Sequence, residues 1–446
     1  MDHRRVAGFI DFGNFEDSLN FLMRNSGYFK NKTVVVVGFA RSGLACANLL
    51  YSLGAHVKVS DSADNAGTRA NLLKLKSPKI QVELGAHNKD FIINNDLLVV
   101  SPGLPQDALP LVWARQFAVP VISEIEVASI LCAAKIIAVT GSNGKTTVTT
   151  LIGRMIEASG RKTFVCGNIG NPFSAVVENI RAEDFVVLEI SSFQLETIRD
   201  FKPHVAVILN ITLNHLDHYN NMREYADAKK RIFINQDKDD FLVLNADDPA
   251  LKEIPALAKP KVVFFRKAAG LNPNQAAVLA VGSTLGIEEN LVYKVFKEFK
   301  GLEHRMEDVA SIKGVKFIND SKATTVDSAL WAVNNIPGSV VLIAGGRDKG
   351  VDYSLMLNAP SGRIKQAVLL GEAKEKIASV FNGKIPLETA SSLEDAVKKA
   401  FAKASKGDSV LFSPMCSSFD MFKDYEERGR VFKKIVIELA EREQGA

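Results

Sequence analysis

A short stretch rich in glycine, lysine and threonine carries the clearest chemical signal in the sequence. Val139-Thr140-Gly141-Ser142-Asn143-Gly144-Lys145-Thr146-Thr147 follows the apolar run Lys135–Val139 and precedes the apolar-periodic segment Val148–Ala158. Glycines let a backbone turn tightly and direct its N–H groups at phosphate oxygens, and the helix N-terminus that follows adds partial positive charge. Lys145 can then neutralise the β- and γ-phosphates of ATP, while the Thr146 hydroxyl can hold Mg²⁺.

This spacing predicts a nucleotide-binding loop between a strand and a helix. The predicted ATP-binding residues of the loop are Gly141, Ser142, Asn143, Gly144, Lys145, Thr146 and Thr147. The common form of the motif has glycine where this chain has Val139, so a glycine-rich turn without a ligand is the alternative interpretation.

A second glycine-containing turn, Gly38-Phe39-Ala40-Arg41-Ser42-Gly43, resembles a dinucleotide-binding fingerprint, with Asp61 downstream. Ala40 stands at the position of the second glycine, whose missing side chain lets a pyrophosphate approach the backbone. The sequence therefore disfavours an NAD-dependent oxidoreductase. A nucleotide sugar remains compatible, with its diphosphate near the turn and Asp61 accepting from a sugar or base. The other alternative is a turn that needs glycine only for close packing.

The composition is that of a globular enzyme with several domains. The chain has 446 residues, 47% of them hydrophobic and 24% charged, and its net charge is only +4. No basic block stands out, so we expect no nucleic-acid partner. Cys46, Cys132, Cys166 and Cys416 are scattered, which disfavours a zinc site or a disulfide framework. The apolar runs are too short to span a bilayer, and no secretory signal is evident, so we expect a cytoplasmic protein without a membrane partner. We also expect a monomer.

Strand and helix patterns alternate along the chain in three series. Expected strands of the first series are Thr33–Val37, Val57–Val59 and Leu97–Val100, and the segment Val119–Ser123 closes the first domain. Those of the second are Lys135–Val139, Phe185–Leu188, Val205–Leu209 and Phe241–Leu244, with an alanine-rich helix over Gly270–Gly286. Those of the third are Val315–Ile318, Val340–Ile343, Ala367–Leu370 and Ser409–Phe412. Such alternation predicts an α/β protein with three mostly parallel sheets.

We expect three domains, each built on one of these series. Residues 1–124 form an N-terminal Rossmann-like domain, including a lead-in of unknown role at 1–30. Residues 125–300 form a central P-loop ATPase-like domain, and residues 301–446 form a C-terminal Rossmann-like domain.

Several stretches, in their order, resemble the Mur ligases from about Lys32 to the C-terminus. They are Gly38–Gly43, Ser101–Gly103, the phosphate loop, Cys166–Gly170, Leu188–Leu195, Asn319–Thr324, Ser413-Pro414 and Tyr425–Gly429. Asp320-Ser321-Lys322-Ala323-Thr324 is similar to the member that adds D-glutamate, whereas members for alanine or diamino acids differ there. Another amino-acid or polyglutamate ligase of the superfamily, or a P-loop NTPase without a covalent product, are the alternatives.

The resemblance implies that ATP phosphorylates the alanyl carboxylate of UDP-N-acetylmuramoyl-L-alanine. D-glutamate then displaces phosphate from the acyl phosphate, in a step of peptidoglycan precursor synthesis. Such chemistry needs cations around the transferring phosphate and strict alignment of three substrates.

The same resemblance assigns roles residue by residue. The implied catalytic residues are Lys145, His215, Lys229 and Arg305. Two Mg²⁺ ions are implied, with Thr146, Glu189, His215 and Lys229 (as a carbamate) as ligands. The residues implied for the UDP-substrate are Phe39, Ala40, Arg41, Ser42, Asp61, Ser62, Ser101, Asn168 and His215. The wording Leu213-Asn214 before His215 departs from the family pattern, which usually has an acidic residue there.

Further implied contacts concern the rest of the nucleotide and the amino acid. Asn272 and Gln275 are implied for adenine, Arg305 for the phosphates, and Asp320 for the ribose or adenine. Gln275 replaces the more usual asparagine. The residues implied for D-glutamate are Lys322, Thr324, Lys349, Ser418, Phe419 and Tyr425. A dicarboxylate needs cations and hydroxyls of this kind, although Thr325 stands beside them where asparagine is more usual.

Overall fold

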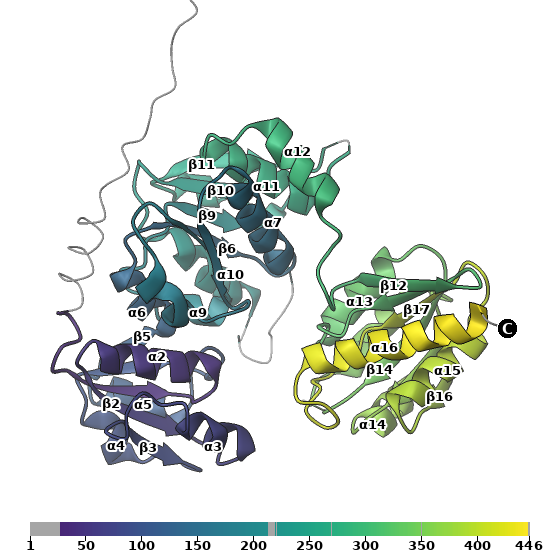
Figure 1. Ribbon diagram of the computed structural model, residues 1–446, viewed down its shortest axis with the longest axis horizontal. Helices are drawn as coiled ribbons and strands as arrows, with labels where there is room; N and C mark the ends of the chain where they lie inside the picture. Colours follow the sequence, from purple (N-terminus) through teal and green to yellow (C-terminus); the bar gives the residue numbers. More distant parts are fainter. Residues whose placement is uncertain (1–26, 213–218, 220, 269, 349, 445–446) are drawn as a thin grey trace, which may run out of the picture. The chain divides into compact units, whose positions relative to one another are not determined.

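The computed structural model describes residues 27–212, 219, 221–268, 270–348 and 350–444 (Figure 1). The chain divides into two compact units, Met1–Phe299 and Lys300–Ala446. Most of the lead-in, residues 1–26, lies outside the described part.

The first sheet of the first unit is parallel throughout, in the order β3-β2-β1-β4-β5. Its strands are β1 Thr33–Val37, β2 His56–Asp61, β3 Gln81–Leu84, β4 Leu97–Val100 and β5 Val121–Ser123, and its helices are α2 Arg41–Ser52, α3 Ala66–Leu72, α4 Lys89–Ile93, α5 Leu109–Gln116 and α6 Glu124–Leu131. Four successive valines of β1 are buried because both faces of the sheet are covered.

The second sheet of this unit is also parallel, in the order β11-β10-β9-β6-β8-β7. Its strands are β6 Lys135–Thr140, β7 Thr163–Gly167, β8 Phe185–Glu189, β9 Val205–Ile208, β10 Phe241–Asn245 and β11 Lys261–Phe265. Its helices are α7 Lys145–Ala158, α8 Phe173–Val176, α9 Ser192–Glu196, α10 Met222–Lys230, α11 Pro273–Thr284 and α12 Glu289–Glu298, with short 3₁₀ turns η1 Val177–Asn179, η2 Arg231–Phe233, η3 Pro249–Leu251 and η4 Ile254–Ala256.

The two sheets of the first unit share a hydrophobic core. Side chains of one face of the second sheet pack with α7, α11 and α12. Side chains of its other face join a cluster that continues through α6, α8 and α2 into the first sheet. The loops that follow the carboxyl ends of β6, β8 and β9 therefore start from a rigid platform.

The second unit is built on one mixed sheet, in the order β12-β13-β17-β14-β15-β16, in which β12 alone is antiparallel to its neighbour. Its strands are β12 Glu307–Ile312, β13 Val315–Asn319, β14 Val340–Gly345, β15 Ile364–Leu370, β16 Leu387–Thr389 and β17 Ser409–Phe412. Its helices are α13 Val326–Asn335, η5 Tyr353–Asn358, α14 Lys374–Phe381, α15 Leu393–Lys403 and α16 Tyr425–Gln444. The long α16 packs with α15 on one face of the sheet (Figure 1).

The predicted α/β class with mostly parallel sheets is confirmed. Each of the four cysteines is buried with a free thiol. Among the described helices, none has the length and apolarity that crossing a bilayer requires.

Candidate active site

The predicted phosphate loop connects the buried strand β6 to the long helix α7. Gly144 caps α7 with φ of 83°, and a Cβ added there would lie 2.4 Å from Oδ1 of Asn274. Glycine is therefore required at this position by both backbone conformation and space. The first turn of α7 contains Lys145, buried Thr146 and half-buried Thr147, all predicted for ATP.

Two lysine amines converge on one carbonyl of this loop. Lys145 Nζ donates to the carbonyl oxygens of Gly141 and Ser142, at 2.9 and 3.0 Å. Lys229, on α10 and only 1% exposed, donates to the same Gly141 oxygen at 3.0 Å. Burial and the nearby charge of Lys145 hold the pKa of the Lys229 amine well below its usual value. The structure thus brings together two of the predicted catalytic residues, 84 positions apart in sequence (229 minus 145).

The loop after β9 supports the phosphate loop from the side. Asn210 accepts from the backbone N–H of Asn143 at 2.8 Å and donates to its carbonyl at 3.1 Å. The Ser142 hydroxyl donates to the Thr212 carbonyl at 3.1 Å and lies 3.1 Å from the Tyr225 hydroxyl. Sequence reasoning did not identify Asn210, Thr212 or Tyr225 as functional. The position of Asn210 directly after a buried strand was the available signal.

Glu189 is the last residue of β8 and pairs in register with Val139 on β6, two residues before Gly141. Its side chain is 1% exposed, and Oε1 accepts from Asn168 at 2.8 Å. Oε2 is buried and has no hydrogen-bond partner among the described residues. Because a buried carboxylate oxygen needs a partner, this geometry fits a cation held near the phosphate loop. Asn168, predicted for the UDP-substrate, is positioned by the same carboxylate.

The two side chains predicted for adenine lie at the start of α11. Asn272 and Gln275 form a reciprocal capping box, each accepting from the backbone N–H of the other at 3.0 Å. Their side-chain oxygens therefore already serve the helix terminus. Asn274, which was not predicted, is the one whose side chain reaches Gly144 of the phosphate loop.

The turn after β1 is organised around a carboxylate. Asp61, at the end of β2, accepts from the N–H of Phe39 at 2.6 Å and from that of Ala63 at 2.8 Å. The Phe39 ring is fully buried, so only its backbone can contact a ligand. The Ser101 hydroxyl, also predicted here, donates to the Gly38 carbonyl at 3.2 Å.

The remaining residues predicted for the UDP-substrate border this turn. Ala40 is the N-cap of α2 and makes no side-chain capping bond. Ala40, Arg41 and Ser62 are exposed and Ser42 is half-buried. The first turn of α2 thus presents backbone N–H groups to solvent beside polar side chains, an arrangement that suits an anionic group.

In the second unit, the segment after β13 contains several predicted residues. Asp320 is 7% exposed and accepts from the Ser413 hydroxyl at 2.9 Å and the Met306 N–H at 3.2 Å. Burial raises the pKa of Asp320 to about 7, although these hydrogen bonds and the charge of Arg305 act in the opposite direction. Asp320 and Arg305, both predicted for the nucleotide, therefore influence each other electrostatically.

The described residues among those predicted for D-glutamate come from two segments of this unit, Lys322–Thr324 and Ser418–Tyr425. Lys322 Nζ lies 5.0 Å from the ring centroid of Tyr425, and Thr324 follows two residues later, half-buried. Ser418 is buried, whereas the ring of Phe419 is 63% exposed. The described structure brings Lys322 and Tyr425 together directly.

A buried arginine that sequence reasoning missed joins these two segments. Arg428 is 1% exposed and donates to the carbonyl and hydroxyl of Ser321, at 2.7 and 3.1 Å, and to the Cys416 carbonyl at 3.1 Å. Burial lowers the pKa of Arg428 to about 10. It lies within the predicted motif Tyr425–Gly429, which was the available signal.

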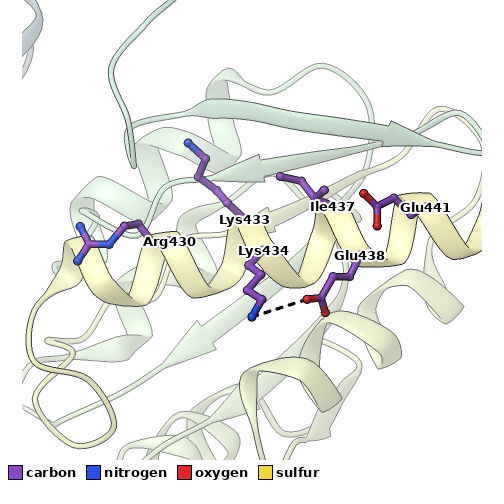
Figure 2. A pocket seen from close by; sticks show the side chains of 6 residues that line it. All are labelled: Arg430, Lys433, Lys434, Ile437, Glu438 and Glu441. Carbon is purple, nitrogen blue, oxygen red and sulfur yellow. Dashed lines mark ion pairs between the residues drawn. The ribbon is translucent and has the colours of Figure 1, made fainter.

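Two predicted residues, His215 and Lys349, lie outside the described residues. Within the described ranges, no three histidine, cysteine, aspartate or glutamate side chains gather as a ready-made metal site. A shallow hollow of about 310 Å³ lies along α16, lined by Arg430, Lys433, Lys434, Ile437, Glu438 and Glu441 (Figure 2). None of the residues predicted for the site lines it.

Three family models match successive parts of the chain. They are the Mur ligase MurD-like N-terminal domain over residues 32–123, the Mur ligase middle domain over 139–294, and the Mur ligase glutamate ligase domain over 304–416.

Among known proteins, the UDP-N-acetylmuramoylalanine–D-glutamate ligase of Geotalea uraniireducens is 42% identical, over 92% of this chain and 98% of that protein. The enzyme of the same name from Koribacter versatilis is 40% identical, over 93% and 99%. Among solved structures, the MurF ligase of Thermotoga maritima in complex with ADP has a TM-score of 0.57 at 18% identity, covering 94% of this chain and 100% of that one. MurC from the same organism has a TM-score of 0.55 at 19% identity, covering 92% and 100%. These two solved structures are similar to this chain in fold.

Proposed function

Since the chain belongs to the UDP-N-acetylmuramoylalanine–D-glutamate ligases of the Mur ligase family, we propose that it uses ATP to join D-glutamate to UDP-N-acetylmuramoyl-L-alanine. The products are the extended peptidoglycan precursor, ADP and phosphate. The observation that carries the proposal is the pair of lysine amines on the Gly141 carbonyl, with an unpartnered Glu189 oxygen on the adjacent strand. We also propose that the enzyme acts as a cytoplasmic monomer, with domains at 1–124, 125–300 and 301–446.

The phosphate loop would bind the triphosphate of ATP. Backbone N–H groups at the start of α7 and the Lys145 ammonium supply positive potential to the β- and γ-phosphates. Lys145 donates to two loop carbonyls in this structure, and we expect its ammonium to turn toward the phosphates when ATP binds. Asn210 and Tyr225 keep the loop in shape while this happens, because their contacts are to Ser142 and Asn143.

Glu189 and Thr146 would hold Mg²⁺, with His215 and a carbamylated Lys229 at a second ion. When bound, Mg²⁺ neutralises charge that develops on the transferring phosphoryl group. Lys229 supports this assignment because carbamate formation needs a neutral amine, and burial beside Lys145 favours that form. The carbamate would convert a buried amine into an oxygen ligand.

The UDP-substrate would bind at the turn after β1. Its diphosphate would meet the first turn of α2 near Arg41 and Ser42, and Asp61 would hold the turn in shape through the Phe39 N–H. The alanyl carboxylate would attack the γ-phosphorus, so the carbon–oxygen–phosphorus link forms as the bond to ADP breaks. Alignment within a near-attack distance provides much of the acceleration.

The second unit would supply the amino acid. Lys322 and Lys349 are suited to the two carboxylates of D-glutamate, with Thr324 and Ser418 as hydroxyl donors. The free amine attacks the acyl carbon, a tetrahedral intermediate forms, and phosphate leaves. Arg305 and Asp320 would contact the nucleotide.

The test is phosphate release from ATP with UDP-N-acetylmuramoyl-L-alanine and one amino acid at a time. We expect release with D-glutamate and none with L-glutamate, L-alanine or diaminopimelate. Release that needs no UDP-substrate would indicate a nucleotide hydrolase, and indifference to D-glutamate would contradict the proposal.

A further inference from the structure

The segment Leu195–Phe201, here named the linking turn, comprises the last two residues of α9 and the first part of the connection to the strand β9. Its backbone polar groups are satisfied by side chains from elsewhere in the first unit. Such arrangements are expected where a buried loop lacks a strand partner. One of these side chains comes from α6, which follows the first sheet, and another comes from η2, which follows the helix α10 that carries Lys229.

Backbone N–H groups of the linking turn are bound by Glu126 of α6, the helix that follows β5 and leads from the first sheet to the second. The Glu126 carboxylate is 1% exposed and accepts from the backbone N–H groups of Arg199, Asp200 and Phe201, at 2.9, 2.8 and 3.0 Å. Immediately before α6, the Ser123 N–H donates to the Thr197 carbonyl at 3.1 Å. The end of the first sheet is thus bonded directly to this turn.

Backbone carbonyls of the linking turn are bound by a second side chain, since Arg231 donates to those of Leu195 and Ile198, at 2.8 and 2.7 Å. Asn235 adds bonds to the carbonyls of Arg199 and Phe201, at 2.8 and 3.0 Å. Arg231 begins η2, directly after α10, and lies two residues from Lys229. The linking turn also continues from α9, which starts three residues after Glu189.

We propose that Glu126 and Arg231 are positioning residues for phosphoryl transfer. Glu126 binds N–H groups of the linking turn and Arg231 binds its carbonyls, and together they fix the first sheet, which carries the turn proposed for the acceptor substrate, relative to Glu189 and Lys229 beside the phosphate loop. This inference rests on the proposed function. Neither residue needs to touch a substrate, since each acts through the backbone of the linking turn.

The physical requirement is alignment of the alanyl carboxylate with the γ-phosphorus. The turn predicted for the diphosphate of the UDP-substrate lies at the first sheet and the phosphate loop lies at the second, although Asn168 and His215 are also predicted for the UDP-substrate. We therefore expect a looser link to lower the rate more than either affinity. A displacement of about 1 Å can cost on the order of 100-fold in rate. If the Glu126 carboxylate had only a structural role, replacing it would lower the stability of the protein and leave the rate of each folded molecule unchanged.

The decisive variant is Glu126→Gln, which keeps the size of the side chain but turns an amide N–H₂ toward the backbone donors. We expect kcat for D-glutamate-dependent phosphate release to fall about tenfold or more, with Kd for UDP-N-acetylmuramoyl-L-alanine and for a non-hydrolysable ATP analogue changed less than about twofold. The matched control is Asp184→Asn. Asp184 is a buried carboxylate, 3% exposed, that accepts from the Arg181 N–H at 2.9 Å at the opposite end of β8 from Glu189. The Asp184→Asn variant should have a lower Tm than the wild type and an unchanged kcat.

Arg231→Lys tests the same link from the other side, since it keeps the charge but cannot reproduce both bonds. It should show the same fall in kcat with unchanged Kd values, even if Glu126→Gln does not fold. Wild-type kcat in either folded variant, or a tenfold loss of affinity that accounts for the slower reaction, overturns the inference alone. A wild-type chain that makes no D-glutamyl product overturns the proposed function, and this inference with it.

Discussion

Two strand–turn–helix connections in the first unit, β1 to α2 and β6 to α7, share a backbone plan and differ in charge. Both turns begin with a glycine at positive φ, Gly38 at 95° and Gly141 at 154°. In the first, the Asp61 carboxylate accepts from a turn N–H. In the second, Lys145 and Lys229 both donate to a turn carbonyl.

This difference teaches that the fold alone does not select the ligand. In the first turn, one N–H is already bonded to a carboxylate, so the anionic ligand proposed there meets the backbone N–H groups and polar side chains at the start of α2. A turn with two amines at its carbonyl has the positive charge that a triphosphate needs. Changing these charges should therefore affect the two substrates separately.

The largest effect is expected for Lys145→Ala. Because the variant removes the cation nearest the transferring phosphate, kcat/KM for ATP should fall by at least about 1,000-fold. Binding of UDP-N-acetylmuramoyl-L-alanine, measured by calorimetry, should stay near the wild-type value. The control is Lys162→Ala, which removes an exposed lysine directly before β7 that pairs with Asp184. Retention of ATP-dependent synthesis in Lys145→Ala would break the comparison.

Lys229→Ala should have the next largest effect, a fall in kcat of about 100-fold or more, because the buried ligand position is lost. Protein incubated with ¹³C-bicarbonate should show a carbamate carbon signal by NMR that the variant lacks. Equal signals in both proteins would remove the carbamate assignment.

Asp61→Asn tests the first turn by itself. Loss of the anionic acceptor for the Phe39 N–H should raise KM for the UDP-substrate about tenfold, the expected cost of about one charge-assisted hydrogen bond. KM for ATP should not change. If both KM values rose together, the two turns would not be separable in function.

The smallest effect concerns the second unit, where a carboxylate lies at a strand end but is buried. Since the folded-state pKa of Asp320 is raised to about 7 from an ordinary value near 3.8, the folded state holds its proton more tightly than the unfolded state. Stability from this group is therefore present at acid pH and is lost as pH rises from about 4 through about 7. Asp320→Asn should remove that dependence and raise Tm relative to wild type at pH 8 but not at pH 4. Parallel Tm–pH curves for the two proteins would contradict the burial argument.

The sequence predicted central strands better than edge strands, and burial explains the difference. The six strands that were not predicted are β3, β5, β7, β11, β12 and β16, and each lies at an edge of its sheet. Edge strands have one neighbour and exposed positions, as in β11 and β16, so their apolar runs are interrupted. Helix α11 is shorter than predicted because the Asn272–Gln275 capping box fixes its start.

The site was predicted where its chemistry lies within one motif. Glu189, Lys145 and Lys322 lie in short sequence motifs that can be recognised by their residues and by their order along the chain. Glu126 was not predicted, because its three partners lie 73 to 75 residues away in sequence. Contacts of that kind depend on how two sheets pack, and no local pattern encodes them.

The central claim is that the γ-phosphoryl group passes to the carboxylate of the UDP-substrate. The most direct measurement uses UDP-N-acetylmuramoyl-L-alanine with both oxygens of the alanyl carboxylate labelled with ¹⁸O, and analyses the released phosphate by mass spectrometry. Because an acyl phosphate leaves with one carboxylate oxygen, each phosphate should carry a single ¹⁸O atom. Unlabelled phosphate released during formation of the D-glutamyl product would contradict the account.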